Sequence, residues 1–401
     1  MSNRSFTPFV WPLRPHSAVA VFAALCALAP MAWGVILFDT ADPTANTAEP
    51  TGDLAGSGWQ YEGQWGSFLG TPIAPQFFIS AAHLGQQGSV FTFQGLNYTI
   101  VRSYSLANSD LLIWQVAETF PSFAPLYTKS DEVNQPLVVF GRGTQRGDGV
   151  YLNDILQGWS WGAADHVQRW GENLVANITS SGTPDNDFLY ATFDQNGLPN
   201  EAQLSAGDSG GAVFLDDNGT WKLAGINYAV DGPYYTDGSG GGAFNAALFD
   251  ARGFWIQNDT PPPDYVQIMD ANPLPSGFYA TRISSKLGWI YSVIDPTGNV
   301  ARDGIPNLLK YALDLNPLAS ATASLPKAAC DGTSLSLTYT KVLAATDITY
   351  TVEQSTDLIN WTTANSQDTV LATNNGIQTI KASVVMGANN PLFLRLRVTR
   401  P

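Results

Sequence analysis

Residues 205–211, in the order Ser-Ala-Gly-Asp-Ser-Gly-Gly, place Ser209 on a short turn that is rich in glycine. A serine hydroxyl becomes a useful nucleophile only when a neighbouring base accepts its proton. Acyl transfer also needs backbone N–H groups that face the oxygen on which negative charge develops, and glycine permits the backbone angles of such a turn. Asp-Ser-Gly turns are also common in ordinary loops. The stretch therefore indicates chemistry only if the fold also supplies a base and an acid.

The chain offers one well-placed base and one well-placed acid. His16 lies in the N-terminal leader and His166 in a polar run, whereas His83 follows the apolar stretch 77–82 at the end of an expected strand. Asp110 enters an apolar stretch, and burial of a charged carboxylate without a partner is costly. An imidazole N–H would satisfy it. We therefore expect His83 and Asp110 to lie close together and to complement the serine.

Three motifs follow one another in a fixed order: Ser-Ala-Ala-His at 80–83, Ser-Asp-Leu-Leu at 109–112 and Gly-Asp-Ser-Gly-Gly at 207–211. Together they resemble the trypsin/chymotrypsin-like serine protease family, in its bacterial, disulfide-free type, over residues 55–258. Short apolar stretches separated by turns also favour an all-β fold. The resemblance implies two six-stranded antiparallel β-barrels, with His83 and Asp110 from the first barrel and Ser209 from the second.

Three further stretches extend this resemblance. Residues 223–228 are similar to the strand beside the substrate, and residues 241–244 to the strand that closes the pocket. Residues 254–256 are similar to the start of the C-terminal helix of the family.

The resemblance also implies a role for each site residue. Ser209 would attack the scissile carbonyl, His83 would act as general base and then general acid, and Asp110 would orient the imidazole. The N–H groups of Gly207 and Ser209 would form the oxyanion hole, and the reaction would need no metal and no cofactor. The predicted function is that of a secreted serine endopeptidase. The alternatives are a protease-like binding module and a surface adhesion protein that acts through residues 265–401.

The resemblance assigns the substrate pocket by position. Gln203 would form its base, and because this amide carries no charge, cleavage after Lys or Arg is disfavoured. Val230 would narrow the pocket, so we expect cleavage after small or medium apolar residues. Further substrate contacts would come from Tyr228, Ala229 and Gly242.

Asp208 precedes the nucleophile and is not a member of the triad. In family members that are activated by cleavage, the corresponding carboxylate pairs with a newly freed N-terminus, but the sequence contains no clear activation site. Arg142, in Gly-Arg-Gly at 141–143, would lie close to that carboxylate, and an Arg142–Asp208 ion pair would let the enzyme fold in an active state. A surface arginine in a turn explains the same residues equally well, and both interpretations stay open.

Changes in composition divide the chain into four parts. Residues 1–34 have a basic start, an apolar core and a small-residue end, which is the pattern of a cleaved signal peptide; an uncleaved anchor is the alternative. Residues 35–258 form the expected protease domain. Residues 259–320 have the pattern of a proline-rich linker with one short helix. Residues 321–401 alternate like the half-buried strands of a small C-terminal β-sandwich.

The two ends of the mature chain carry weaker signals. Residues 35–54 are polar and rich in turns, and we expect a surface arm there. The acidic turn at 295–304 and the helix expected at 306–313 resemble modules in secreted proteins of Verrucomicrobia-like bacteria, as does the terminal strand at 393–398. The turn lacks the alternating carboxylates and the final glutamate of an EF-hand loop, so calcium binding is disfavoured.

Charge and cysteine content restrict the partners and the compartment. The net charge of −15 argues against a nucleic-acid partner. Cys26 falls in the leader, so the mature chain would hold only Cys330 and form no internal disulfide. We expect export to the cell envelope or the medium, no stable membrane insertion after removal of the leader, a monomer, and protein or peptide substrates.

Overall fold

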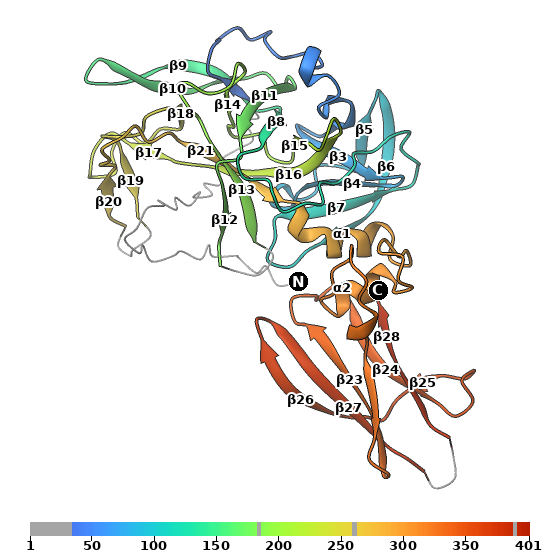
Figure 1. Ribbon diagram of the computed structural model, residues 1–401. Coiled ribbons are helices and arrows are strands. Elements are labelled where there is room, and N and C mark those ends of the chain that lie inside the picture. Colours follow the sequence, from blue (N-terminus) through green and yellow to red (C-terminus); the bar gives the residue numbers. More distant parts are fainter. Residues whose placement is uncertain (1–33, 183–185, 259–262, 388–390) are drawn as a thin grey trace.

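The computed structural model describes residues 34–182, 186–258, 263–387 and 391–401. The predicted signal peptide therefore lies outside the described residues, apart from Gly34. Within the described ranges the chain is mostly β-strand, and two α-helices lie between a larger β region and a smaller one (Figure 1). None of the helices in these ranges is long and apolar enough to span a membrane.

The first part of the chain forms a closed antiparallel barrel around an aromatic interior. Phe78 stacks on Phe91 with ring centroids 4.0 Å apart, and both side chains are fully buried. Complete burial of one such side chain contributes about 1.5–3 kcal/mol. Gly63 and Gly70 leave room for these rings, because a Cβ at either position would clash with one of them. In the described chain the barrel runs in the order β2 (Gly63–Trp65), β3 (Phe68–Ala74), β4 (Phe77–Ala81), β7 (Leu111–Val116), β6 (Leu96–Ser105) and β5 (Val90–Phe93).

The second unit repeats this strand order. If the short edge strand of the second unit, β12 (Asn177–Ser180), is left out, each unit has six described strands, which can be numbered along the chain. In both units the first strand then pairs with the second and fourth, the fifth with the fourth and sixth, and the third with the sixth. The second and third strands pair only in the first unit; in the second unit β11 and β13 lie close together without a paired register. Among the described residues this sheet runs β11 (Arg169–Leu174), β8 (Pro136–Gly141), β15 (Ala212–Asp216), β16 (Trp221–Val230), β21 (Gly277–Arg282), β13 (Asp187–Thr192) and β12 (Asn177–Ser180).

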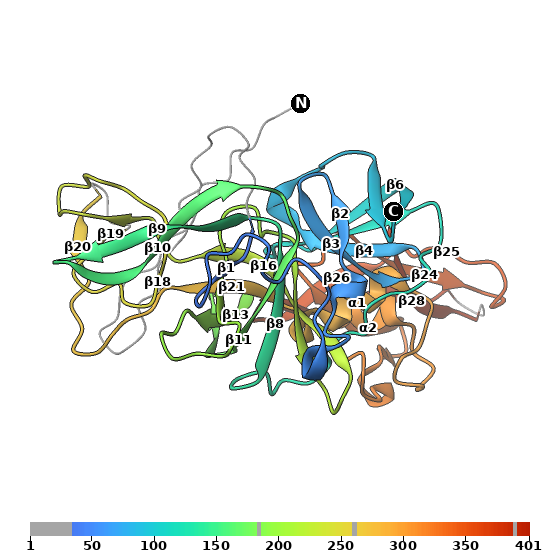
Figure 2. The same ribbon diagram turned by 90° about the horizontal axis from the view of Figure 1, so that it is seen from above.

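Two insertions between these strands form a separate lobe. The hairpin of β9 (Thr144–Leu152) and β10 (Ile155–Ala164) follows β8 in the chain, and residues 231–276 separate β16 from β21. Figures 1 and 2 show both insertions on the side of the second unit that faces away from the first barrel. The second insertion contains β17 (Tyr234–Tyr235), β18 (Ala246–Leu248), β19 (Trp255–Gln257) and β20 (Tyr265–Gln267), and β18 pairs with β10.

This second insertion corrects two predictions. Residues 254–256 do not begin a helix, because β19 is a strand that pairs with β17 and β20. Residues 241–244 do not form the strand that was expected to close the pocket; they lie in a turn that closes through a bridge between Tyr234 and Phe244. The strand that pairs with β16 after the insertion is β21, and the α-helix that follows β21 is α1 (Leu287–Ile294). These two elements occupy the places that the sequence analysis gave to 241–244 and 254–256.

The boundary predicted at residue 258 is wrong, because the second unit ends later in the chain. β21 lies inside its sheet, between β16 and β13. Trp289 and Ile290 of α1 are buried in a core to which both units contribute. The proline-rich stretch at 261–263 has the composition of a domain linker, but it falls within an insertion. Residues 277–294 therefore belong to the second unit and its core, and not to a linker.

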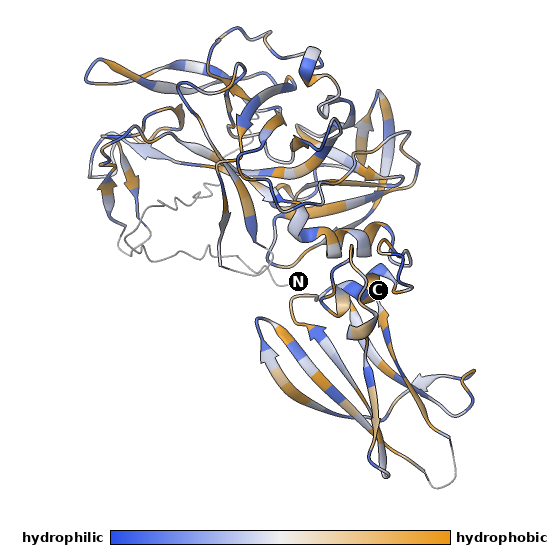
Figure 3. Ribbon diagram, viewed as in Figure 1, coloured by the Kyte–Doolittle hydropathy of each residue, from blue (hydrophilic) through white to orange (hydrophobic). Residues whose placement is uncertain are grey.

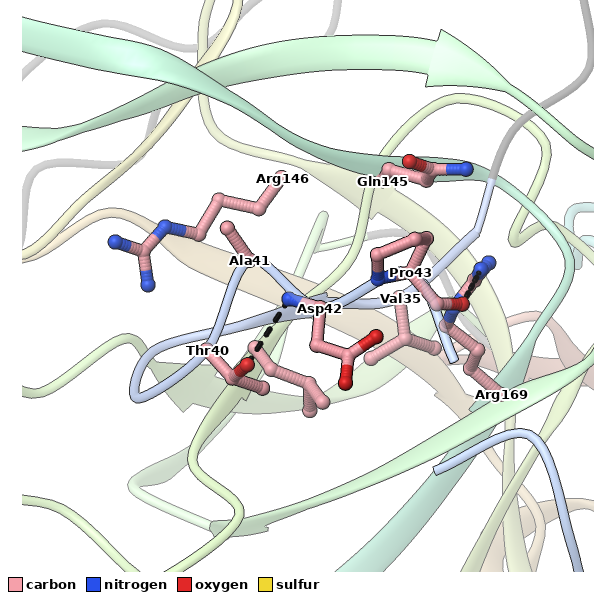
Figure 4. A pocket seen from close by; sticks show the side chains of 9 residues that line it. Val35, Thr40, Ala41, Asp42, Pro43, Gln145, Arg146 and Arg169 are labelled. Carbon is pink, nitrogen blue, oxygen red and sulfur yellow. Dashed lines mark hydrogen bonds between the residues drawn. The ribbon is translucent and has the colours of Figure 1, made fainter. Parts of the chain in front are cut away.

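The segment predicted as a surface arm begins with buried residues. Val35 and Ile36 are 1% and 0% exposed, and β1 (Ile36–Leu37) pairs with β14 (Ala202–Gln203). Figure 4 shows residues 40–43, which follow this strand, close to Arg146 and Arg169. The Arg169 guanidinium donates a hydrogen bond to the carbonyl of Pro43. The apolar residues of this strand continue the apolar run of the leader in the sequence, which is why the pattern did not predict a strand.

The C-terminal region is a β-sandwich, in agreement with the alternation in the sequence. Apolar and polar bands alternate along its strands (Figure 3). Leu337 and Ile380 from one sheet and Val352 from the other share a core. The short helix predicted at 306–313 is α2 (Asn307–Ala312). In the described residues one sheet contains β22 (Lys327–Cys330), β23 (Ser334–Val342), β27 (Ile377–Val385) and β26 (Gln367–Asn374), and the other contains β25 (Thr362–Thr363), β24 (Thr349–Ser355) and β28 (Phe393–Thr399).

Arg400 joins the sandwich to the rest of the molecule. Its Nε donates to Asp347 of the sandwich at 2.9 Å, and its Nη2 donates to the hydroxyl of Ser292 on α1 at 2.8 Å. The guanidinium carbon also lies 5.9 Å from the ring centre of Tyr104 on β6. A planar guanidinium can serve several such partners at once. The sandwich is therefore held against α1 and the first barrel by a shared polar joint.

Candidate active site

Antiparallel pairing brings His83 and Asp110 together. β4 pairs with β7 so that Ala81 faces Leu111, and the backbone N–H of Ala82 then donates to the carbonyl of Asp110 at 2.9 Å. The chain leaves β4 through a single 3₁₀ turn at Ala82–Leu84. This turn places the imidazole beside the carboxylate, although 27 residues separate the two positions in the chain.

A series of hydrogen bonds links Asp110, His83 and Ser209. Asp110 Oδ2 lies 2.7 Å from His83 Nδ1, and His83 Nε2 lies 2.9 Å from Ser209 Oγ. Asp110 Oδ1 accepts the backbone N–H of His83 at 2.7 Å. An ionised carboxylate only accepts hydrogen bonds, so Nδ1 carries the proton and Nε2 is the acceptor for the serine hydroxyl. The His83 side chain is 24% exposed and that of Asp110 is 11% exposed, so solvent reaches the base but scarcely the acid.

The other two histidines do not enter this series. His16 lies outside the described residues. His166 is exposed, and its carbonyl accepts a hydrogen bond from Arg142 Nε at 2.8 Å.

Glycines give the nucleophile turn its shape. Gly207 and Gly210 have φ values of +95° and +81°, a region that residues with a Cβ rarely adopt. A Cβ at Gly210 would also clash with the hydroxyl of Ser80 on β4. Ser209 is half-buried, and the described residues provide no hydrogen-bond acceptor for the N–H groups of Gly207 and Ser209. These are the two N–H groups that the sequence assigned to an oxyanion hole.

Asp208 and Arg142 do not form the ion pair that one of the two interpretations of the sequence expected, although the Asp208 carboxylate lies against the 141–143 turn. The Asp208 carboxylate is 1% exposed and accepts hydrogen bonds from the backbone N–H groups of Gly143 and Ser205, at 2.8 and 2.7 Å, and from the Ser205 hydroxyl. Arg142 Nε donates to His166 instead, and its Nη1 is buried without a partner in the described structure. Burial raises the pKa of Asp208 to about 8, although the hydrogen bonds from Ser205 lower it.

We expect the free energy of unfolding to fall as the pH rises from about 5 to about 8.5. Burial raises the pKa of Glu201 to about 7 and that of Asp231 to about 6, in addition to that of Asp208. Carboxyl groups of an unfolded chain titrate near pH 4. The folded chain therefore binds more protons in this range, and stability that is complete below pH 4 is lost as the pH passes through the folded values. Thermal unfolding measured across the range tests this.

The control for this prediction is a pair of carboxamide variants. Asp208→Asn removes the group with the highest of the three pKa values and should flatten the pH dependence. Asp148→Asn, at an exposed position, should leave it unchanged. A wild-type stability that increases from pH 5 to pH 8.5 would contradict the assignment.

Of the five predicted substrate residues, three lie on the strand next to the candidate site and two lie elsewhere. Tyr228, Ala229 and Val230 lie at the end of β16, and the Tyr228 ring is 5.9 Å from the His83 ring. Gln203 is 1% exposed, and its Nε2 donates to the hydroxyl of Ser276 at 3.0 Å, so its amide is part of a buried hydrogen-bonded contact. Gly242 lies in the exposed turn described above and not in a strand of the second unit.

A buried carboxylate next to this strand, that of Asp231, was missed in the sequence. The Asp231 carboxylate accepts hydrogen bonds at 2.8 Å from the hydroxyls of Tyr190 and Tyr279 and from the backbone N–H of Gly277. It follows β16 directly, and its partners come from β13 and β21. The sequence feature that could have located β21 is the Gly-Phe-Tyr-Ala-Thr-Arg stretch at 277–282, which an apolar helix follows. It was not recognised because the insertion places it far from β16 in the chain.

One carboxylate of the acidic turn before α2 pairs with a lysine of that helix. Asp303 accepts a hydrogen bond from the Lys310 ammonium at 2.9 Å, and Lys310 is fully buried. In the described residues, no group of three or more His, Cys, Asp or Glu side chains is arranged to hold a metal ion. Cys330 is a free, exposed cysteine.

Comparisons with known proteins give a similarity of structure. No family model matches the sequence, and no curated protein matches it. The structure is similar to the Rv3671c protease of M. tuberculosis. For a serine-to-alanine mutant in the inactive form the TM-score is 0.34 at 14% identity, over 61% of this chain and 96% of that one. For the active form the TM-score is 0.30 at 13% identity, over 63% of this chain and 97% of that one. It is also similar to the murine norovirus NS6 protease, with a TM-score of 0.26 at 15% identity, over 47% of this chain and 92% of that one.

Proposed function

We propose that this protein is a serine endopeptidase that hydrolyses peptide bonds through an acyl-enzyme. The observation that carries the proposal is the continuous series of hydrogen bonds from Asp110 through His83 to the half-buried hydroxyl of Ser209. A general base within hydrogen-bond reach of a hydroxyl, itself oriented by a third group, is the arrangement that nucleophilic catalysis needs.

The geometry supports one sequence of proton transfers. His83 Nε2 takes the proton of Ser209 as Oγ attacks the scissile carbonyl carbon, and Nδ1–H stays hydrogen-bonded to Asp110, which stabilises the imidazolium that forms. The same Nε2–H then protonates the leaving amine. Water repeats the attack on the ester and restores the serine. The N–H groups of Gly207 and Ser209 stabilise the oxygen that becomes negative in each tetrahedral intermediate.

The proposal includes a substrate class and a location. Gln203 is neutral and Asp231 already accepts three hydrogen bonds, so the features that favour basic substrate side chains are weak. We propose cleavage after small or medium apolar residues. Export through the leader remains part of the proposal, and residues 1–33 lie outside the described structure. The sandwich would be an accessory module.

Covalent labelling tests the proposal. A fluorophosphonate probe reacts with a serine that an adjacent base activates, so wild-type protein should be labelled and Ser209→Ala should not. Ser89→Ala, at an exposed serine of the first barrel, should be labelled like the wild type. An unlabelled wild-type protein with a normal thermal transition would overturn the proposal and favour a protease-like binding module.

A further inference from the structure

Asn227 is a buried carboxamide in contact with the nucleophile turn. It lies on β16, is 1% exposed, and precedes Tyr228 at the edge of the site. Its Nδ2 donates to the carbonyl of Asp208 at 3.0 Å and to the carbonyl of Phe140 on β8 at 2.7 Å. Because both neighbours are carbonyl acceptors, the nitrogen and not the oxygen of the amide must face them.

The surrounding backbone is built to admit this side chain. A Cβ at Gly211 would lie 3.0 Å from Asn227 Nδ2 and would clash with the Phe140 carbonyl. The backbone of Asn227 also joins the turn, because its carbonyl accepts the N–H of Gly210 at 3.1 Å and its N–H donates to the carbonyl of Gly211 at 2.8 Å. Asn227 therefore contacts the turn through its main chain and its side chain at once.

The bonded carbonyl belongs to the peptide whose nitrogen is that of Ser209. A peptide bond is planar and trans, so its C=O and N–H point in opposite directions. A donor that holds the Asp208 carbonyl therefore also fixes the direction of the Ser209 N–H, which has no acceptor within the described residues. Apart from Asn227, the Asp208 carbonyl accepts only the N–H of Gly211 in the described structure, at 3.2 Å.

The turn needs such a restraint because of its glycines. Gly207 and Gly210 flank the peptide in question, and glycine rotates more freely about its backbone than any other residue. If the Asp208–Ser209 peptide rotated, the Ser209 N–H would leave the position in which it can stabilise an oxyanion. The Gly211 N–H that bonds to the Asp208 carbonyl belongs to the same glycine-rich turn, whereas the Asn227 carboxamide restrains this carbonyl from a neighbouring element, β16.

We propose that Asn227 is a positioning residue for the oxyanion hole, which orients the Ser209 N–H by holding the carbonyl of the same peptide. The proposal rests on the peptidase function proposed above. Asn227 does not touch the substrate; it acts through the nucleophile turn. Its loss should therefore lower the rate of the chemical step and leave substrate binding nearly unchanged.

The test compares two asparagines of the same sheet. Asn173 on β11 is also 1% exposed, and its Nδ2 also bridges two carbonyls, those of Thr192 and Ala202, at 2.8 and 3.0 Å. Asn227→Ala should lower kcat on a peptide substrate by about 100-fold, in the range seen when one oxyanion donor is lost, with KM within about twofold. Asn173→Ala should lower the melting temperature to a similar extent and leave kcat within about threefold.

A second variant and a second readout keep the test decisive. Asn227→Asp preserves the shape but places acceptors against both carbonyls, so it should also lose kcat. Affinity for a peptide aldehyde, which forms an oxyanion on binding, should fall together with kcat in both Asn227 variants. If Asn227→Ala or Asn227→Asp folds and keeps kcat within about threefold of wild type, or if it changes KM alone, the positioning role is wrong. If wild-type protein shows neither turnover nor fluorophosphonate labelling, the peptidase proposal itself fails.

Discussion

Replacement of Ser209 by alanine is expected to lower kcat by about 10⁶-fold, because no other described group stands at hydrogen-bond distance from His83 Nε2 to act as nucleophile. His83→Ala should cost about as much, since an unassisted hydroxyl is a poor nucleophile. The double variant should be no slower than either single variant, because the two residues act as one unit. Turnover of a chromogenic peptide, with the folded fraction measured for each protein, tests all three.

The double variant separates catalysis from a general loss of structure. If the residues acted independently, the two losses would multiply, and a multiplicative result would exclude the proposed mechanism. Ser89→Ala serves again as the control and should keep wild-type turnover. The melting temperature of Ser209→Ala should stay close to that of the wild type, since the hydroxyl is half-buried and bonded to one partner.

Asp110→Asn is expected to lower kcat by about 10⁴-fold without a comparable change in KM. The asparagine side chain has the same shape, but its amide can donate a hydrogen bond to His83 Nδ1. That bond would hold the imidazole with its proton on Nε2, where it can no longer accept the proton of Ser209. Kinetics at saturating and limiting substrate measure the two parameters separately.

A surface carboxamide provides the control for this variant. Asp154→Asn also removes one negative charge, at an exposed position between β9 and β10 that is distant in the chain from His83, Asp110 and Ser209. It should leave kcat unchanged. A loss of less than about tenfold in Asp110→Asn, with the fold intact, would mean that the carboxylate does not set the tautomer of His83.

The proximity of His83, Asp110 and Ser209 could be expected from the sequence because local patterns specify each part of this candidate site. An apolar strand that ends shortly before His83 pairs with another that begins directly after Asp110, so the pairing of these two stretches places the two side chains together. The glycines around Ser209 specify a turn by their freedom from a Cβ. Alternation also predicted the sandwich, because half-buried strands leave a period of two in the residues themselves.

The sequence did not predict features that depend on contacts between distant segments. The side chain of Arg142 is long enough to reach Asp208, and only the direction in which the turn leaves β8 decides that it bonds to His166. The apolar residues after Gly34 continue the pattern of the leader, and no local sequence pattern predicts that they pair with β14, which lies more than 160 residues later. The insertion at 231–276 separates the last strand of the second unit, β21, from β16 in the chain. The sequence therefore favours a weaker match for this strand, at 241–244, closer to β16.

Because β21 comes late in the chain, its position determines where the protein can be truncated without loss of the fold. A fragment that stops at Asn258 lacks the strand between β16 and β13, which leaves two open edges in the sheet and uncovers the apolar surface that α1 protects. Open edges of this kind pair with other chains, so such a fragment would aggregate. The shortest fragment that we expect to fold on its own therefore extends through Ile294, and removal of everything beyond it costs only α2, the sandwich and the polar joint around Arg400.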